Sequence, residues 1–276
     1  MEFNIIFVLV AGAIIIAFFA GFITRYKDLQ EDKLNAEVGM SIDQMISSLR
    51  GTTLYKNIST EVPFNLVFNC DRFSVNGLDQ DLTGTVFASK NIKSDNILTW
   101  TKEWKHPFRV DDVIYFVDGN VKYYLESDPL NLLEEMPENI RNNFISSGDA
   151  DVYVVFSLNN VNSFRQRGKV IYVNPNENEI KFYDISGEKI SHYLSKELVY
   201  GAIFAADFEN YKCGYSKLME KYENVRRVYG KKASSLNSIF PECNYNGIIN
   251  SLNNGNNNEI LFENNRLSED GCEVVF

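Results

Sequence analysis

The sequence predicts an α+β protein in which an N-terminal transmembrane helix extends into an amphipathic stalk helix, followed by a β-rich head with antiparallel hairpins and a C-terminal helix. Three observations predict this class: an uncharged apolar stretch at the start, a helical period that continues beyond it, and a strand-like period after Gly51. The chain has 276 residues, of which 45% are hydrophobic, so it can close one or two packed cores. Its formal charge of -10 argues against nucleic acid as a partner.

Residues 1–24 form the expected transmembrane helix. No charged residue occurs between Phe3 and Thr24, and at 1.5 Å per residue this stretch spans roughly 30 Å, the thickness of the hydrocarbon layer. A cleaved secretory signal is the alternative, but the chain starts Met-Glu rather than with basic residues, and its apolar run is longer than in most signals. We therefore expect a retained signal-anchor and a single-pass protein of the cell membrane, with the lipid bilayer as its first partner.

Ala13, Ala17 and Gly21 lie along one stripe of this helix because they repeat every four residues. Small residues at this spacing let two helices approach closely in lipid. The stripe favours helix packing, and with it a homo-oligomer through the N-terminal helix. The alternative is that Ala and Gly are simply common in membrane helices.

Residues 25–50 are expected to continue the helix as an amphipathic stalk. No Pro interrupts the chain before Gly51, and charged residues occupy the faces between the apolar ones. One helix of about 50 residues follows, half in lipid and half against a folded domain or a partner helix. Its apolar stalk positions recur with helical spacing: Leu29, Leu34, Val38, Ile42, Met45, Ile46 and Leu49.

An apolar N-terminal helix, its amphipathic extension and a β-rich head resemble type IV pilins and pseudopilins over about the first 50 residues. The resemblance implies a role in a surface or secretion assembly. The family's basic leader ending in Gly has no counterpart here, and its acidic residue near the helix start corresponds only to Glu2, so no functional residue is carried over. The start Phe-Asn-Ile-Ile-Phe-Val-Leu-Val-Ala-Gly-Ala and the scattered cysteines also resemble uncharacterised single-pass membrane proteins of small-genome archaea, which implies no activity.

Short runs rich in apolar and β-branched residues predict the strands of the head. One antiparallel hairpin is expected around Asp118-Gly119-Asn120, because Asp-Gly between two apolar runs is a strong signal for a tight turn. A second hairpin is expected around the turn-rich residues 174–178, between runs at 170–173 and 180–183. Further strands are expected at residues 64–68, 83–89 and 152–158, and residues 274–276 are expected to return as an edge strand.

Helical spacing predicts two helices in the head, at residues 129–145 and 211–229, with Gly230 as the C-terminal cap of the second. Five Asn and one Gly between Asn253 and Asn258 predict an exposed loop. A natural joint at residues 146–149 divides the head, so we expect a β-rich lobe over residues 51–148 and an α+β lobe with the Asn-rich loop over residues 149–276.

The side of the membrane depends on four cysteines: Cys70, Cys213, Cys243 and Cys272. Their even number without a Cys-x-x-Cys pair favours two disulfides in an oxidising compartment, with buried free thiols or a zinc site as alternatives, and leaves the pairing open. Arg25, Lys27 and Lys33 follow the apolar helix, and by the positive-inside rule they favour a cytoplasmic head. The cysteines and the common orientation of a lone N-terminal anchor favour the opposite, and we expect an extracytoplasmic head.

No recognisable catalytic constellation occurs, so we expect neither an enzyme nor a cofactor. His106 and His192 are the only histidines, and such residues are more often surface or capping residues than proton-transfer groups. Five aspartates could bind calcium, but they lack the 12-residue ligand loop, so no metal site is assigned: Asp79, Asp81, Asp111, Asp112 and Asp118.

Two further clusters each have two interpretations. Trp100, Trp104 and Phe108 form a possible partner surface, whereas a core with basic flanks is the simpler interpretation. Four basic residues near the expected end of the second helix either suit the helix dipole there or contact acidic headgroups: Arg226, Arg227, Lys231 and Lys232.

These features predict a single-pass, membrane-anchored structural or interaction protein that acts with other membrane or surface proteins in a cell-surface or secretion assembly of pilin-like type. The alternative is a membrane-tethered ligand-binding module or enzyme with a pocket between the two lobes, in a head that could face the cytoplasm.

Overall fold

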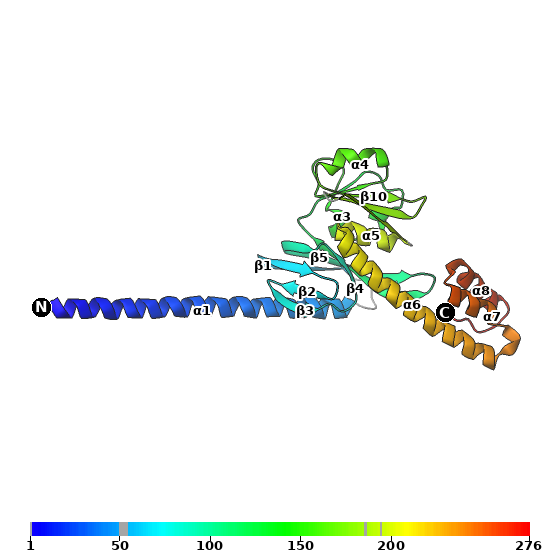
Figure 1. The fold of residues 1–276 in the computed structure, drawn as a ribbon, viewed down its shortest axis with the longest axis horizontal. Helices are drawn as coiled ribbons and strands as arrows, with labels where there is room; N and C mark the ends of the chain where they lie inside the picture. Colours follow the sequence, from blue (N-terminus) through cyan, green and yellow to red (C-terminus); the bar gives the residue numbers. More distant parts are fainter. Residues whose placement is uncertain (1, 50–54, 185–186, 194) are drawn as a thin grey trace.

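The computed structural model describes residues 2–49, 55–184, 187–193 and 195–276. The fold is α+β, with an apolar N-terminal helix, a β-rich region and helices at the C-terminal end, which confirms the predicted class. Figure 1 shows α1 (Glu2–Leu49) projecting from the head as a rod. The last helices of the chain lie at the end of the head opposite the N-terminus.

The first sheet has six strands in the order β3-β2-β1-β5-β6-β4. Neighbouring strands are antiparallel except β4 and β6, which run parallel. Side chains alternate between the faces of a strand, so Tyr115 of β6 joins the core on one face and Phe116 the core on the other. The strands are β1 (Tyr55–Phe68), β2 (Arg72–Val75), β3 (Leu78–Asp81), β4 (Thr85–Ala88), β5 (Asn91–Lys105) and β6 (Arg109–Asp118).

The second sheet has the order β12-β11-β10-β9-β7-β8. Strands β8, β7, β9 and β10 run parallel, and β11 and β12 add antiparallel pairs at one edge. Helix α4 (Leu158–Arg165) connects β9 to β10, and the Glu126 carboxylate accepts hydrogen bonds from the N–H groups of Phe156 and Ser157 just before it. The strands are β7 (Tyr123–Leu125), β8 (Phe144–Ile145), β9 (Val152–Val155), β10 (Lys169–Asn174), β11 (Glu179–Asp184) and β12 (Gly187–His192).

Helix α5 (Lys196–Ala205) lies between the two sheets, and α6 (Phe208–Ile239) crosses the first sheet beside it (Figure 1). Both helices approach the ring of Phe87 in β4 through a glycine. A Cβ atom added at Gly201 would lie 2.9 Å from that ring, and one added at Gly214 would lie 2.7 Å from it. One continuous core therefore joins both sheets, α5 and α6, while α1 and α4 pack on the outer faces.

Three further helices lie at the C-terminal end, where η1 and α7 pack on α6 and α8 packs on α7: η1 (Pro241–Cys243), α7 (Asn246–Asn254) and α8 (Asn257–Glu269). Gly255 ends α7 with a positive φ of 69°, and the Asn256 side chain accepts a hydrogen bond from the N–H of Glu259 in the first turn of α8. The predicted Asn-rich loop is therefore wrong in extent, because most of its residues end one helix or begin the next.

The predicted hairpin around Asp118-Gly119-Asn120 is wrong. Strand β6 belongs to the first sheet and β7 to the second, so this turn carries the chain from one sheet to the other. Gly119 packs against β5, where its N–H donates to the carbonyl of Asn96 at 2.9 Å and a Cβ would collide with Asn96. The division between the sheets falls between Asp118 and Tyr123, not at the expected joint near residue 148.

Two helix predictions also need correction. The expected helix at residues 129–145 is broken into α2 (Leu132–Glu135) and α3 (Glu138–Arg141), because Pro137 disfavours a helical conformation at Met136, whose ψ is 141°. The expected cap Gly230 lies inside α6, which continues to Ile239 because Ala233 and Leu236 are buried.

The expected edge strand at the end of the chain is also wrong, because residues 272–276 form no strand. The Asn264 side chain instead accepts a hydrogen bond from the N–H of Val275 at 2.8 Å.

Candidate functional site

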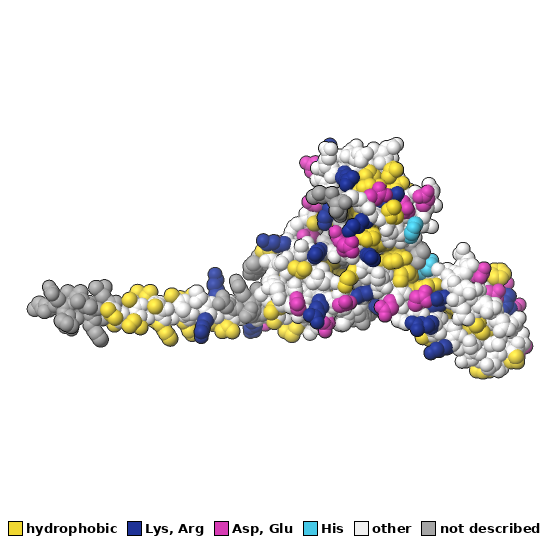
Figure 2. Space-filling model, viewed as in Figure 1, with side chains coloured by type: hydrophobic (Ala, Val, Ile, Leu, Met, Phe, Trp, Pro, Cys, Tyr) yellow, Lys and Arg dark blue, Asp and Glu magenta, His cyan; other side chains and the backbone are white. Residues whose placement is uncertain are grey.

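The described apolar part of α1 is exposed and makes no packing contact with the head. Residues Val10–Lys27 are long and apolar enough to cross a membrane, and none of this stretch is buried. Figure 2 shows hydrophobic side chains along the rod. Such a surface is unfavourable in water and suited to a bilayer, since these apolar side chains are all more than half exposed: Val10, Ile14, Ile15, Ile16, Phe18, Phe19, Phe22 and Ile23.

The small-residue stripe is open to a neighbouring molecule. Ala13, Ala17 and Gly21 are all exposed. Apart from its chain neighbours and the helix backbone, no described atom lies within 4 Å of the position that a Cβ of Gly21 would occupy. The stripe therefore exposes small residues in the part of α1 that is apolar enough to cross a membrane.

The later part of α1 is docked on the head. The side chain of Asn76 donates a 2.6 Å hydrogen bond to that of Asn35, and Ile42 is fully buried in the core under the first sheet. Gly39 is buried against Gln80, where a Cβ would collide with the amide. The apolar rod and this docked part belong to one continuous helix. Tyr26, which lies before the contact with the head, is exposed.

The four cysteines form two disulfide pairs. Cys70, in the turn between β1 and β2, pairs with Cys213 of α6 across a Cα–Cα distance of 5.4 Å. Cys243 of η1 pairs with Cys272 near the C-terminus across 5.9 Å. The pairs lie in separate parts of the fold, an arrangement that fits disulfides and not the expected alternative of one zinc site.

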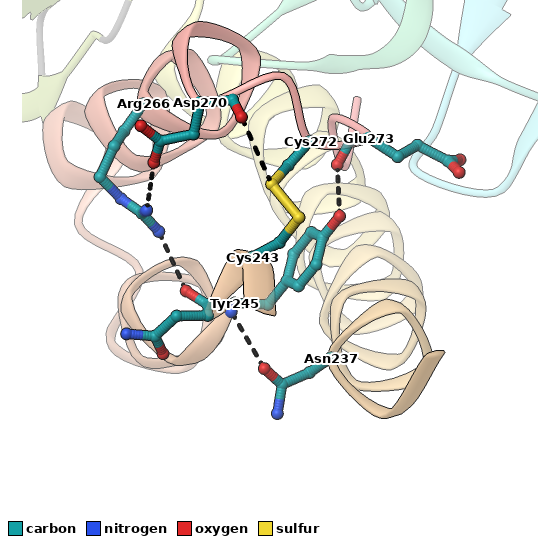
Figure 3. The surroundings of a disulfide bond; sticks show 8 residues. Asn237, Cys243, Tyr245, Arg266, Asp270, Cys272 and Glu273 are labelled. Carbon is teal, nitrogen blue, oxygen red and sulfur yellow. Dashed lines mark hydrogen bonds and ion pairs between the residues drawn. A yellow bond between two sulfur atoms is a disulfide. The ribbon is translucent and has the colours of Figure 1, made fainter. Parts of the chain in front are cut away.

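Figure 3 shows that the second disulfide closes a small unit around Tyr245. This residue is fully buried, and its hydroxyl donates to the carbonyl of Glu273 at 2.8 Å. Its N–H donates to the side chain of Asn237 at the end of α6, at 3.0 Å. Arg266 of α8 bridges Asp270 and the carbonyl of Asn244. The C-terminal segment is therefore attached to both α6 and α8.

Trp100, Trp104 and Phe108 do not form an exposed partner surface. The structure buries all three in the core that joins the sheets, with 3%, 0% and 2% of their surface exposed. Trp104 donates its indole N–H to the Ser195 hydroxyl at 3.0 Å, and the ring of Phe108 stacks on Tyr222. The interpretation as a core with basic flanks is the correct one.

A cluster of ion pairs connects β5 to helices α2 and α5. Lys102 forms ion pairs with Glu135 of α2 and Glu197 of α5, and Lys196 forms another with Glu135 at 2.7 Å. The hydrogen bonds from Lys102 and Lys196 lower the pKa of Glu135. Burial raises the pKa of neighbouring Tyr200, whose hydroxyl donates to the carbonyl of Leu132. This cluster holds helices to a sheet and presents no unpaired catalytic group.

The two histidines have different surroundings. His192 is exposed at the end of β12. His106, in the turn between β5 and β6, lies 2.6 Å from the amide nitrogen of Asn257 and stacks on Trp104. The side-chain oxygen of Asn257 accepts a hydrogen bond from the Tyr222 hydroxyl at 2.5 Å. The amide NH2 group of Asn257 therefore points at His106 and donates to Nε2, which accepts because the imidazole is neutral. Sequence reasoning missed this role of Asn257.

The aspartates considered for calcium are spread over the head and in part already paired. Asp111 accepts hydrogen bonds from Thr85 and Lys221, and Asp112 pairs with Arg109. Among the residues that the structure describes, no group of three or more His, Cys, Asp or Glu side chains is arranged to hold a metal ion.

The space between the two sheets is filled by side chains. The ring of Phe204 in α5 lies 5.6 Å from that of Tyr115 in β6 and 5.8 Å from that of Tyr123 in β7. All three rings are buried, so the core occupies this part of the space between the sheets. Comparisons with known proteins find no matching family model, no matching curated protein and no matching solved structure, so the function must be inferred from these residues.

Proposed function

We propose that the protein is a single-pass membrane-anchored interaction protein whose head lies outside the cytoplasm, within a surface or secretion assembly of pilin-like type. The observation that carries this proposal is α1, one helix that exposes an apolar span at one end and is docked into the head at the other. The helix serves to hold a folded head at a defined distance from a bilayer.

The cysteines support the orientation. All four are paired, and disulfides persist in oxidising compartments outside the cytoplasm. Arg25 and Lys27 at the end of the span favour the opposite orientation, but the positive-inside bias is a statistical preference that export of a lone N-terminal anchor can override. The exposed stripe at Ala13, Ala17 and Gly21 supports contacts between anchors in the membrane.

The proposal is tested by labelling intact cells with a membrane-impermeant maleimide. The variant Ser127→Cys adds a thiol at an exposed position of the head. We expect this thiol to be labelled in intact cells without reductant, and the four native cysteines to be labelled only after reduction. A cytoplasmic marker protein must stay unlabelled. If the introduced thiol reacts only after lysis, and the native thiols then react without reductant, the head is cytoplasmic and the proposed orientation is wrong.

A further inference from the structure

The basic residues of α6 do not lie at the end of a helix. Arg227 and Lys231 are followed by two further turns of α6, so the dipole at the helix end gives them no support. They stand four residues apart on one face, a spacing at which like charges repel each other. The helix dipole therefore does not explain why Arg227 and Lys231 lie together in a chain of net charge -10.

The basic residues next to Arg227 and Lys231 form ion pairs with carboxylates. Arg226 pairs with Glu223 and donates to the carbonyl of Asn253 in α7, and Lys232 pairs with Glu273. Among the residues that the structure describes, the guanidinium of Arg227 donates to two neutral acceptors, the side chain of Asn224 and the backbone carbonyl of Glu223. In the described ranges, no carboxylate forms an ion pair with Arg227 or Lys231.

These two cations line an open groove between α6 and α7, here called the α6–α7 groove. Gly230 also lines the groove and is here called its floor; apart from its chain neighbours and the backbone of α6, no described atom lies within 4 Å of the position that a Cβ there would occupy. The α7 wall includes the half-buried aliphatic side chain of Ile249 and the exposed Asn253. Glu223 also lines the groove but is paired with Arg226, so the α6 wall keeps a net positive charge and stands beside an aliphatic wall and a floor without a side chain.

We propose that the α6–α7 groove is a docking site for an acidic segment of a partner protein. Carboxylates of that segment pair with Arg227 and Lys231, and an aliphatic side chain packs on Ile249. An aliphatic wall suits a peptide better than a polyanionic sugar, because burying a hydroxyl without a hydrogen bond is unfavourable. Headgroups of the anchoring bilayer are a poor match because the groove lies at the end of the head opposite α1 (Figure 1).

This inference rests on the proposed function and names the surface at which the head meets its partner. It is tested with the full chain in lipid nanodiscs and a short fluorescent peptide of alternating Glu and Leu, by fluorescence anisotropy. Replacing Glu by Gln in the peptide should abolish the charge-dependent part of binding. A sulfated oligosaccharide, measured in the same way, represents the sugar as occupant.

Reversal of both cations, Arg227→Glu with Lys231→Glu, is expected to weaken peptide binding by about tenfold or more. Lys90→Glu with Lys93→Glu is the matched control, because both lysines are exposed and the net charge changes by the same amount. This control should keep the affinity within about twofold. Gly230→Gln, which fills the floor, should also abolish binding, whereas Gly230→Ala should retain it.

Several results would overturn the inference: no binding of the acidic peptide, equal losses in the two charge-reversal pairs, or tight binding of the sulfated oligosaccharide alone. Thermal unfolding of each variant separates a lost site from a lost fold. The maleimide assay tests the orientation independently of peptide binding, so a failure of the groove and a failure of the proposed function give different results.

Discussion

His106 and Asn257 connect the turn between β5 and β6 to the first turn of α8, and this contact depends on a neutral imidazole. Burial lowers the pKa of His106. The neighbouring groups do not favour a cation either: the Tyr222 ring faces His106 from α6 and has the Arg226 guanidinium over it, and the α8 N-terminus carries a positive partial charge.

A pH dependence follows from this contact. The folded head binds a proton at His106 less readily than the unfolded chain does, so the stabilisation is complete above about pH 6.5 and is lost as the pH falls through the lowered pKa of the folded state. We expect the thermal midpoint of the head to fall more between about pH 7.5 and pH 5 in the wild type than in His106→Gln, which keeps an acceptor but does not titrate. Equal pH dependence in the two proteins would contradict this expectation.

Single residues were the hardest features to predict. Asn257 belongs to an Asn-rich run, and Asn favours turns so strongly that local sequence indicated a loop. Its role depends on Tyr222 and His106, which are distant in sequence and are brought together only by the fold. The tryptophans could be placed in the core but not excluded from the surface, because aromatic residues serve both purposes.

At the scale of elements, α6 contains two glycines with opposite requirements. A Cβ atom added at Gly214 would lie less than 3.0 Å from the ring of Phe87 and from the carbonyl of Val86, which is too close. A Cβ added at Gly230 would face open space. Gly214→Ala should lower the free energy of unfolding by about 1–3 kcal/mol through overpacking. Gly230→Ala should raise it by up to about 1 kcal/mol, since Ala is the better helix former. Chemical denaturation measures both, and a loss of stability in Gly230→Ala would show that the groove floor is closed.

The anchor helix permits a second prediction at this scale. If copies pack through the small-residue stripe, Ala17→Cys in the membrane should form a disulfide-linked dimer on oxidation. Phe19→Cys, on the opposite face of the same helix turn, should not. Gel electrophoresis without reductant reads the result. Equal crosslinking at both positions would indicate random collisions, and no crosslinking at Ala17→Cys would remove the homo-oligomer through the N-terminal helix from the proposal.

Elements were predictable where a local pattern decides them. The long apolar stretch and the strand-rich composition of the head were sufficient for the α+β class and the N-terminal helix. The turn at Gly119 was not decided locally, because an Asp-Gly turn can close a hairpin or carry the chain to another sheet. Gly230 was mistaken for a cap because only the burial of Ala233 and Leu236 shows that α6 continues.

For the whole molecule, the two disulfides differ in the length of chain that they close. Cys70 and Cys213 are 143 residues apart, and Cys243 and Cys272 are 29 apart. Restriction of the unfolded chain then contributes about 5 kcal/mol for the first and about 4 kcal/mol for the second. Replacing both cysteines of the first pair by Ser should lower the denaturation midpoint more than the same change in the second. The reverse order would indicate that local contacts around the pairs dominate.

The arrangement of the whole head could not be predicted from the sequence. The predicted boundary near residue 148 rested on a flexible-looking segment, whereas the two sheets are joined by one core through α5. The cysteine pairing depends on which chain segments meet in space, and that is set by the packing of α6 on the first sheet. Such long-range choices leave no signal in a single sequence.

The continuity of α1 from the apolar segment to Ile42 has a mechanical consequence. Transmembrane helices tilt when their apolar length exceeds the local bilayer thickness. If α1 spans a bilayer as proposed, any tilt there turns the head through the same angle, because the same helix is docked in the head by Asn35 and Gly39. At 1.5 Å per residue the helix is a lever of roughly 70 Å, so a small change in membrane thickness swings the far end of the protein sideways across the membrane surface.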